Sequence, residues 1–262
     1  MTRQPSLYIP HGGGPCFFMD DPRGIWTGMA AFLRSLPDLL PERPKAILIV
    51  SGHWETDGFA FTAAERPPLL FDFHGFPPHT YALTYPAPGD PALAARAAGL
   101  LQDAGLNTAL DPQRGLDHGV FVPLKVAFPH ADVPIVEMSV DRRLDPAQHL
   151  AAGRALAPLR DEGVLIVGAG MSFHNMRGYG DPRATDPSRQ FDAWLAEAAT
   201  RDAEPRATAL MRWAEAPAGR FSHPREEHLL PLMVAAGASD APGEHVYAEL
   251  VMETAISGFR FG

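Results

Sequence analysis

Short apolar runs, each bounded by turn residues, recur along the chain and predict the strands of a β-sheet. Two of these runs, at 46–50 and 164–167, are continuous and apolar, which is typical of strands buried on both faces of a sheet. Five more apolar segments also predict strands, at 6–10, 58–63, 133–140, 246–251 and 257–261.

Between these strands, apolar residues return at the spacing of a helix. A proline follows a capping residue at two of the predicted starts, Asp145-Pro146 and Asp186-Pro187, and Ser222 with Pro224 suits a third. Because strands and helices alternate, we expect an α/β fold: one domain over 1–262 with a mainly parallel or mixed central sheet flanked by helices. The predicted helices cover 25–36, 91–106, 145–159, 186–200, 206–215 and 226–236.

Composition excludes several classes of protein. The chain has 262 residues, of which 31 are acidic and 22 are basic, so a net charge of −9 argues against nucleic-acid binding. A single cysteine, Cys16, excludes a disulfide framework and a cysteine-based zinc finger, and we expect it to be buried and unreactive. Neither a signal peptide nor an apolar stretch long enough to span a membrane is visible, so we expect a cytoplasmic protein.

Histidines are the informative residues, and three of the 11 follow apolar strands directly. These are His11, His53 and His174, and glycines lie beside each of them. If the three strands are parallel neighbours, their carboxyl ends meet at one edge of the sheet, where α/β proteins bind ligands. One such histidine alone is more often a hydrogen-bonded residue at a strand end. Three with the same placement favour a metal pocket, although an enzyme without a metal could also place them this way.

Two further clusters carry candidate groups. His118 lies in Asp117-His118-Gly119, in a loop that leads into an apolar segment. Glu226, Glu227 and His228 fall in the first turns of the predicted last helix, where the helix dipole favours a carboxylate. For Glu226, a surface role is the simpler interpretation.

Five of the other histidines divide by position. His74 and His79 lie in the proline-rich segment 72–91, which we expect to be a long functional loop that can touch a substrate. His130, His149 and His245 are expected on the solvated surface.

Taken together, these segments resemble the class III extradiol ring-cleavage dioxygenases, specifically the DOPA 4,5-dioxygenase type, which is related to the catalytic subunit of protocatechuate 4,5-dioxygenase. Each segment is weak evidence alone, but their order along nearly the whole chain is specific. The segments that carry the resemblance are 10–15, 51–55, 72–77, 85–89, 117–119, 174–175 and 224–232.

The resemblance implies a mononuclear non-haem Fe(II) site that opens a small catecholic substrate with O2, although Zn(II) occupies the site in some related proteins. His11, His53 and His228 match the metal ligands. His174 matches a histidine that acts as an acid/base or as a further ligand to zinc, and His118 matches one that contacts substrate. Because more distant relatives use two histidines and one carboxylate, Glu227 stays an alternative third ligand.

This chain departs from the family pattern at two places. Gly52 stands where alanine is common, and Gly13-Gly14 replace a Ser-Pro type of pair, a change that alters the shape of the pocket and leaves the substrate open. Apolar side chains such as Phe17, Phe18 and Trp54 could seat an aromatic ring or simply pack in the core.

Two other functions compete with ring cleavage. One is a zinc-dependent hydrolase built on the same histidines. The other is a non-enzymatic interaction protein that keeps the fold, but the presence of all five pocket histidines argues against it. A homodimer is the expected oligomer only because such dimers are the commonest.

Overall fold

A computed structural model describes residues 2–262, and its eight strands form one mixed sheet in the order β4-β3-β5-β2-β6-β1-β8-β7. The four central strands, β5, β2, β6 and β1, run parallel, whereas β8 pairs antiparallel with β1 and with β7, and β3 pairs antiparallel with β5. The strands are β1 (Ser6–Pro10), β2 (Ala46–Thr56), β3 (Phe59–Thr62), β4 (Thr108–Asp111), β5 (Ile135–Asp141), β6 (Val164–Gly170), β7 (Gly243–Val251) and β8 (Thr254–Phe261).

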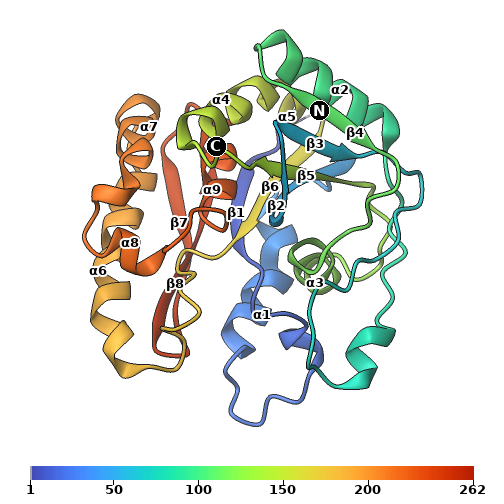
Figure 1. The fold of residues 1–262 in the computed structure, drawn as a ribbon. Coiled ribbons are helices and arrows are strands. Elements are labelled where there is room, and N and C mark those ends of the chain that lie inside the picture. Colours follow the sequence, from blue (N-terminus) through green and yellow to red (C-terminus); the bar gives the residue numbers. More distant parts are fainter. Residues whose placement is uncertain (1) are drawn as a thin grey trace.

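Helices cover both faces of the sheet (Figure 1). One face carries α1 (Thr27–Ser35) and α3 (His118–Ala127), and the other carries the remaining α-helices. The latter are α2 (Pro91–Asp103), α4 (Pro146–Leu156), α5 (Pro158–Asp161), α6 (Thr185–Ala199), α7 (Ala203–Met211), α8 (Gly219–Ser222) and α9 (Leu230–Gly237). Short 3₁₀ helices lie at Cys16–Phe18, Leu36–Leu39, Pro78–Ala82, Pro182–Ala184 and Trp213–Glu215.

The continuous apolar strands are explained by these two layers. Along β2, Leu48 and Val50 pack in the core beneath α2, α4 and α9, while Ile47 and Ile49 pack in the core beneath α1 and α3. All four side chains are fully buried. Because both faces of the strand are covered, no position along it needs to be polar.

The register of the parallel strands aligns the residues that follow them. Ala169 of β6 pairs with Ile9 of β1 on one side and with Ser51 of β2 on the other. His11 and His53 each lie two residues beyond this row, so both are carried to the same edge of the sheet. An irregularity in the pairing of β2 with β5, between Ser51 and Glu55, surrounds His53. Such bulges turn side chains near functional sites.

Two glycines of β6 let the segment before α9 approach the strand closely. A Cβ atom on Gly168 would lie 2.2 Å from the carbonyl oxygen of Pro231, and one on Gly170 would lie 2.2 Å from that of His228. The backbone N–H of Met171 and the hydroxyl of Tyr8 both donate to the His228 carbonyl, at 3.2 and 3.0 Å. His228 is therefore held directly beside the end of β6, between the strands that carry His11 and His53.

The α/β fold with a mixed sheet is confirmed, and each of the seven predicted strands is present. Two predicted helix starts are wrong. Ser222 ends the short helix α8, and α9 begins at Leu230, so Glu226 and His228 lie in a turn before the helix. Asp186 lies inside the first turn of α6 and does not cap it.

Two further expectations are corrected. His118 is the first residue of α3, a helix hidden in the sequence because Pro123 lies inside it. His149, expected at the surface, is fully buried, and its ring donates from Nδ1 to the Asp145 carbonyl at 2.7 Å and accepts at Nε2 from the Asp141 N–H at 3.2 Å. Among residues 2–262, no helix is both long enough and apolar enough to cross a membrane.

We predict that His149 makes stability depend on pH. Burial lowers its pKa to about 4, so the folded protein keeps this ring neutral where the unfolded chain already binds a proton. The neutral His149 ring therefore makes its full contribution to the free energy of unfolding above the ordinary histidine pKa. This contribution is lost as the pH falls towards 4. The loss is on the order of 3 kcal/mol at most.

Urea unfolding of the wild type and of His149→Gln, at about pH 7.5 and about pH 4.5, measures this contribution. We expect the wild type to lose more stability on acidification than His149→Gln does. His130→Gln, a change at an exposed histidine, should behave like the wild type. Equal acid sensitivity of His149→Gln and the wild type would refute the assignment.

Candidate metal centre

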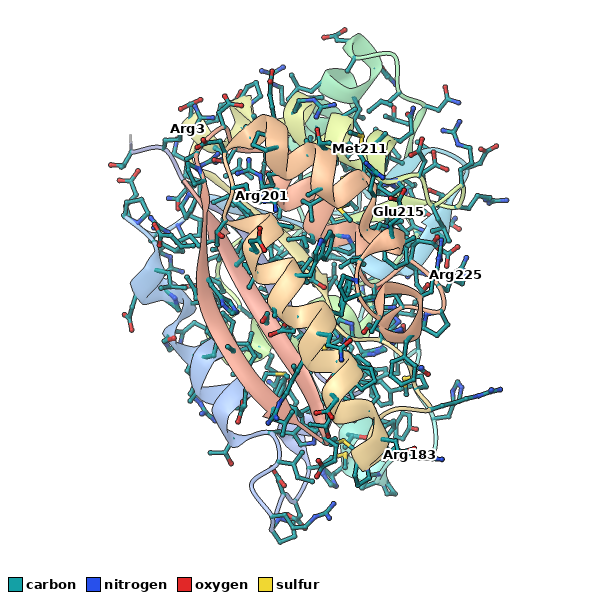
Figure 2. The ribbon with its side chains drawn as sticks, turned by 90° about the vertical axis from the view of Figure 1, so that its left-hand side faces the viewer. Arg3, Arg183, Arg201, Met211, Glu215 and Arg225 are labelled. Atoms are coloured by element: carbon teal, nitrogen blue, oxygen red, sulfur yellow. The ribbon has the colours of Figure 1, made fainter. Side chains whose placement is uncertain are left out.

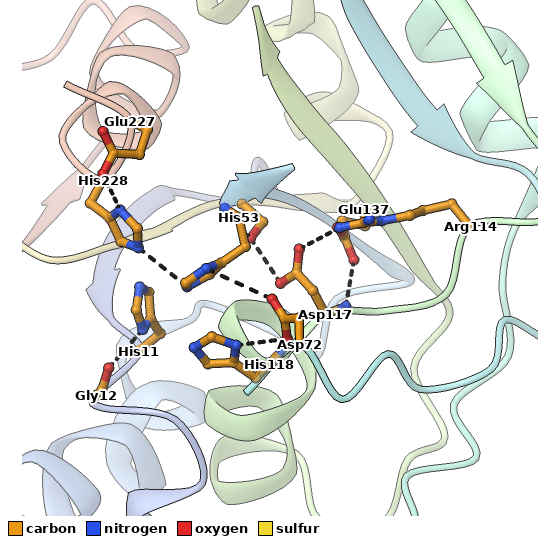
Figure 3. Close-up of polar contacts among 11 residues, drawn as sticks. His11, Gly12, His53, Asp72, Arg114, Asp117, His118, Glu137, Glu227 and His228 are labelled. Atoms are coloured by element: carbon orange, nitrogen blue, oxygen red, sulfur yellow. Dashed lines mark hydrogen bonds and ion pairs between the residues drawn. The ribbon is translucent and has the colours of Figure 1, made fainter. Parts of the chain in front are cut away.

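Three histidine rings meet at the carboxyl ends of the central strands. The ring centroids of His11 and His53 lie 4.9 Å apart, those of His11 and His228 5.1 Å apart, and those of His53 and His228 4.6 Å apart. Figure 3 shows the three side chains pointing towards one another from separate parts of the chain. The strand-end histidines His11, His53 and His174 line one cavity, as predicted, but the ring that completes the central trio is His228, on which His174 stacks.

His11 presents a nitrogen that has no partner. Its Nδ1–H donates to the carbonyl of Gly12 at 2.8 Å, which leaves Nε2 with an unshared electron pair. The side chain is 2% exposed, and Nε2 is buried without a hydrogen bond. A buried polar atom without a partner is costly unless something absent from the protein chain completes it.

The rings of His53 and His228 face each other through their Nε2 atoms. Their Nε2 atoms are 3.2 Å apart. The Nδ1–H of His228 donates to Glu227 at 3.0 Å, so its Nε2 also carries an unshared pair. The Nδ1 of His53 lies 3.8 Å from a carboxylate oxygen of Asp72. His228 is thus held from behind by a hydrogen bond, whereas His53 has only the more distant Asp72 carboxylate behind it; both rings turn Nε2 towards each other.

Glu227 supports two histidines at once. Its Oε1 lies 3.0 Å from Nδ1 of His228 and 3.3 Å from Nδ1 of His174, and the two rings stack with centroids 3.4 Å apart. Burial alone would raise the pKa of Glu227, but the hydrogen bonds from both histidines hold it well below the ordinary value. Because this oxygen is already occupied, Glu227 acts as an acceptor behind the rings.

Asp72 has the same role on the opposite side. One of its oxygens accepts from the ring Nδ1 of His118 at 2.7 Å and from the His118 backbone N–H at 3.0 Å, at the start of α3. Burial opposes ionisation, yet these bonds lower the pKa of Asp72 to about 2. A charged carboxylate therefore fixes the ring of His118, which lies 4.0 Å from the ring of His53 between centroids.

The three central histidines are neutral near pH 7. Burial, reinforced by the His118 ring, lowers the pKa of His53 to about 4. Burial and the neighbouring imidazoles also hold the pKa values of His11 and His228 well below the ordinary value. Neutral imidazole is the form that binds metals, so no proton has to be displaced at neutral pH.

The donor atoms fit a divalent cation. Two sets of three groups have potential ligand atoms within 4.8 Å of one another, namely His11, His53 and His118, and His174, Glu227 and His228. The two sets meet where His53 and His228 touch. Facing Nε2 atoms need a proton or a cation between them, and a cation held there would satisfy each one.

A buried polar cluster lies behind His53 and His118. Ser51 accepts from the His53 backbone N–H at 3.2 Å and donates to Asp117 at 2.9 Å. The Asp117 backbone N–H in turn donates to Glu137 at 3.0 Å, and Arg114 lies 3.1 Å from Asp117. Burial and the nearby Asp117 raise the pKa of Glu137 well above its ordinary value. This cluster links β2, β5 and the start of α3.

Several predicted neighbours of the site lie elsewhere. Phe17, Phe18 and Trp54 do not line the cavity beside the histidines. Of the two histidines in the 72–91 loop, His74 lines it, whereas His79 bonds to the Phe18 carbonyl instead. Cys16 is buried as expected, and burial raises its pKa to about 12.

Sequence reasoning gave no role to Asp72 or to the Glu137 cluster. Asp72 lies in 72–77, one of the segments that carry the family resemblance, but nothing in its sequence spacing connects it with His118, 46 residues later. Glu137 lies in an apolar strand, where a lone acidic residue is the one signal that could have drawn attention to it.

Comparison with known proteins agrees with this geometry. Residues 6–259 match the family described as the catalytic LigB subunit of aromatic ring-opening dioxygenase. A protein of Portulaca grandiflora named 4,5-DOPA dioxygenase extradiol is 41% identical over 95% of this chain and 90% of its own length. An Escherichia coli K12 protein of the same name is 38% identical over 91% of this chain and 86% of its own length.

A solved structure supports the same relationship. The crystal structure of an uncharacterized Escherichia coli K12 protein superposes with a TM-score of 0.78 at 32% identity, covering 99% of this chain and 100% of the other. The chain therefore belongs to the LigB family of extradiol ring-cleavage dioxygenases, a family of oxidoreductase enzymes.

Proposed function

We propose that this enzyme uses O2 to open the aromatic ring of a catecholic substrate at an Fe(II) ion held by His11, His53 and His228. The observation that carries the proposal is the set of Nε2 atoms just described, with that of His11 buried and unpartnered. Three protein ligands leave coordination positions open for a substrate and O2. Zn(II) suits the same nitrogen ligands and is expected to occupy the site in some preparations.

When bound, Fe(II) would lower the pKa of the catechol oxygens and pass electron density to O2. The protein supplies the proton transfers. Glu227 holds Nδ1 of His174, which leaves Nε2 of that ring to take a proton from a catechol hydroxyl and to return it later. Asp72 likewise holds Nδ1 of His118, so Nε2 of His118 is free to hydrogen-bond a substrate oxygen.

The arrangement separates two kinds of histidine. His11, His53 and His228 are neutral, closely packed and turned towards one another, as ligands must be. His174 and His118 flank them, and each has its Nδ1 beside a carboxylate; both line the cavity, as His11 and His53 also do. Glu227 is not proposed as a ligand because its oxygen accepts from two imidazoles.

We predict O2-dependent ring opening. After anaerobic loading with Fe(II), an O2 electrode should record one O2 consumed for each catechol, with a yellow ring-opened product. A zinc-dependent hydrolase needs no O2, so turnover of a hydrolysable substrate by the zinc form without O2 uptake would replace this proposal with that one. Protein without metal is the control and should consume no O2.

We predict different outcomes for two neighbouring histidines. His228→Ala should lose bound iron, because removing one of three ligands undoes most of the chelate. His174→Ala should keep the iron but lose turnover by about 10²–10⁴-fold, as expected for a positioned acid/base. Metal analysis and steady-state kinetics of both purified variants measure this difference.

The matched control is His245→Ala, at an exposed histidine of β7, which should keep both metal and activity. Iron lost from His174→Ala but kept by His228→Ala would exchange the two roles. Glu227 would then become the better candidate for the third ligand.

We also predict that Asp72→Asn lowers turnover by about 10–100-fold, since the carboxylate that fixes a ring from behind tunes its position and basicity. The fold should be kept, because Asp72 is only partly buried and the change is isosteric. Kinetics and circular dichroism test both statements. Asp103→Asn, at the exposed end of α2, is the control. Unchanged kinetics in Asp72→Asn would show that His118 needs no carboxylate.

A further inference from the structure

The cavity in front of the histidine centre has a volume of about 400 Å³. Such a volume is typical of small-molecule sites and leaves space beyond the ring that the histidines would hold. What lines this space decides which substituent the ring can carry. Besides the histidines, the lining consists of Gly12, Gly13, Gly14, Trp26, Phe73, Phe76, Met171, Met176, Tyr179 and Met252.

No arginine, lysine, aspartate or glutamate lines this cavity, as far as residues 2–262 are concerned. The nearby carboxylates of Asp72 and Glu227 are held by histidine nitrogens. Two arginines near the histidine centre are paired, Arg225 with Glu55 and Arg114 with Asp117. Arg177, between the lining residues Met176 and Tyr179, is exposed and does not line the cavity. Apart from the histidines, a charged substituent would therefore find no ionic partner in the lining after leaving water, which is unfavourable.

One wall of the cavity is aromatic because of the glycine loop. A Cβ atom on Gly14 would lie 2.8 Å from the Phe76 ring, and one on Gly13 would lie 3.4 Å from Trp26. The two rings therefore occupy space that larger residues in the loop would fill. Phe73 packs edge-to-face on Phe76, with centroids 5.4 Å apart, and extends this wall.

The other wall is built from methionines. Met171 is buried beyond the end of β6, whereas Met176 and Met252 are 70% and 36% exposed. A hydrogen bond of 2.7 Å from Gly180 N–H to the Met252 carbonyl joins the two loops that carry them. The hydroxyl of Tyr179 donates to the Phe173 carbonyl at 2.6 Å, so its polar atom is already used. Methionine adapts its shape to apolar ligands.

On the basis of the proposed function, we infer that the preferred substrate is a catechol whose ring substituent is uncharged and apolar. The hydroxyl end of the ring faces the histidines. The substituent lies between the aromatic wall and the methionine wall. Exposed methionines at the edge of a cavity are the kind of apolar surface that marks a binding site. DOPA, which carries a carboxylate and an ammonium group, is expected to bind less well.

Binding without O2 tests the inference separately from turnover. We would titrate the Fe(II)-loaded enzyme anaerobically, by calorimetry, with 4-isopropylcatechol and with 3,4-dihydroxybenzoate, whose substituents have nearly the same shape but differ in charge. We expect the isopropyl compound to bind at least about tenfold more tightly. Equal binding, or tighter binding of the carboxylate, would overturn the inference.

A charge placed in the methionine wall should reverse the preference. Met252→Arg is expected to tighten binding of 3,4-dihydroxybenzoate by about tenfold and to weaken binding of 4-isopropylcatechol. Met176→Arg, in the other loop of the wall, is a second variant in case the first does not fold. The control is Met211→Arg on α7, where the methionine is 43% exposed and lies on the face shown in Figure 2. No change in ranking in either cavity variant would contradict the inference.

The two proposals fail in different ways. If the apolar catechol binds more tightly but no catechol consumes O2, the function is wrong and the specificity of the cavity stands. If O2 uptake is observed but is fastest with charged catechols, the function stands and the apolar specificity is wrong.

Discussion

The centre depends on how closely the chain around His228 approaches strand β6. Glycines at 168 and 170 remove the side chains that would hold this segment away, and Gly52 does the same on β2, where a Cβ atom would lie 2.6 Å from the Glu227 carbonyl. The absence of side chains at these points lets a loop histidine lie between two strand histidines. Gly52, where alanine is common in the family, thus lies at the contact between strand β2 and the backbone of Glu227.

Besides this close backbone approach, the centre requires that its histidine rings stay uncharged. Five histidines in one small volume would repel one another if they were protonated, and burial disfavours that charge. The protein keeps the central rings neutral and places its charges behind the rings, on Asp72 and Glu227. Each carboxylate holds an Nδ1–H and leaves an Nε2 turned inwards. The same arrangement orients rings and keeps them basic, which is what metal ligation and proton transfer both need.

The site is divided between two kinds of backbone. His11 and His53 come from the sheet or its immediate end, where pairing with β6 sets their positions. The apolar walls come from loops: residues 12–14, residues 73–76, residues 171–179 and the turn between β7 and β8. Rigid strands suit the positions that chemistry demands, and loops suit positions that determine which substituent fits.

The sequence by itself determined the fold class, seven of the eight strands and the histidines at strand ends, because a strand buried on both faces needs a continuous apolar run and ligands bind at the edge beyond it. The short strand β4, with no buried residue, was not predicted. It could not determine the helix hidden by Pro123, the burial of His149 or the turn that carries His228. Those depend on contacts between residues far apart in the chain. Asp72 with His118, and Gly170 with His228, became partners only in the tertiary structure, because local periodicity carries no information about which loops the folded sheet brings together.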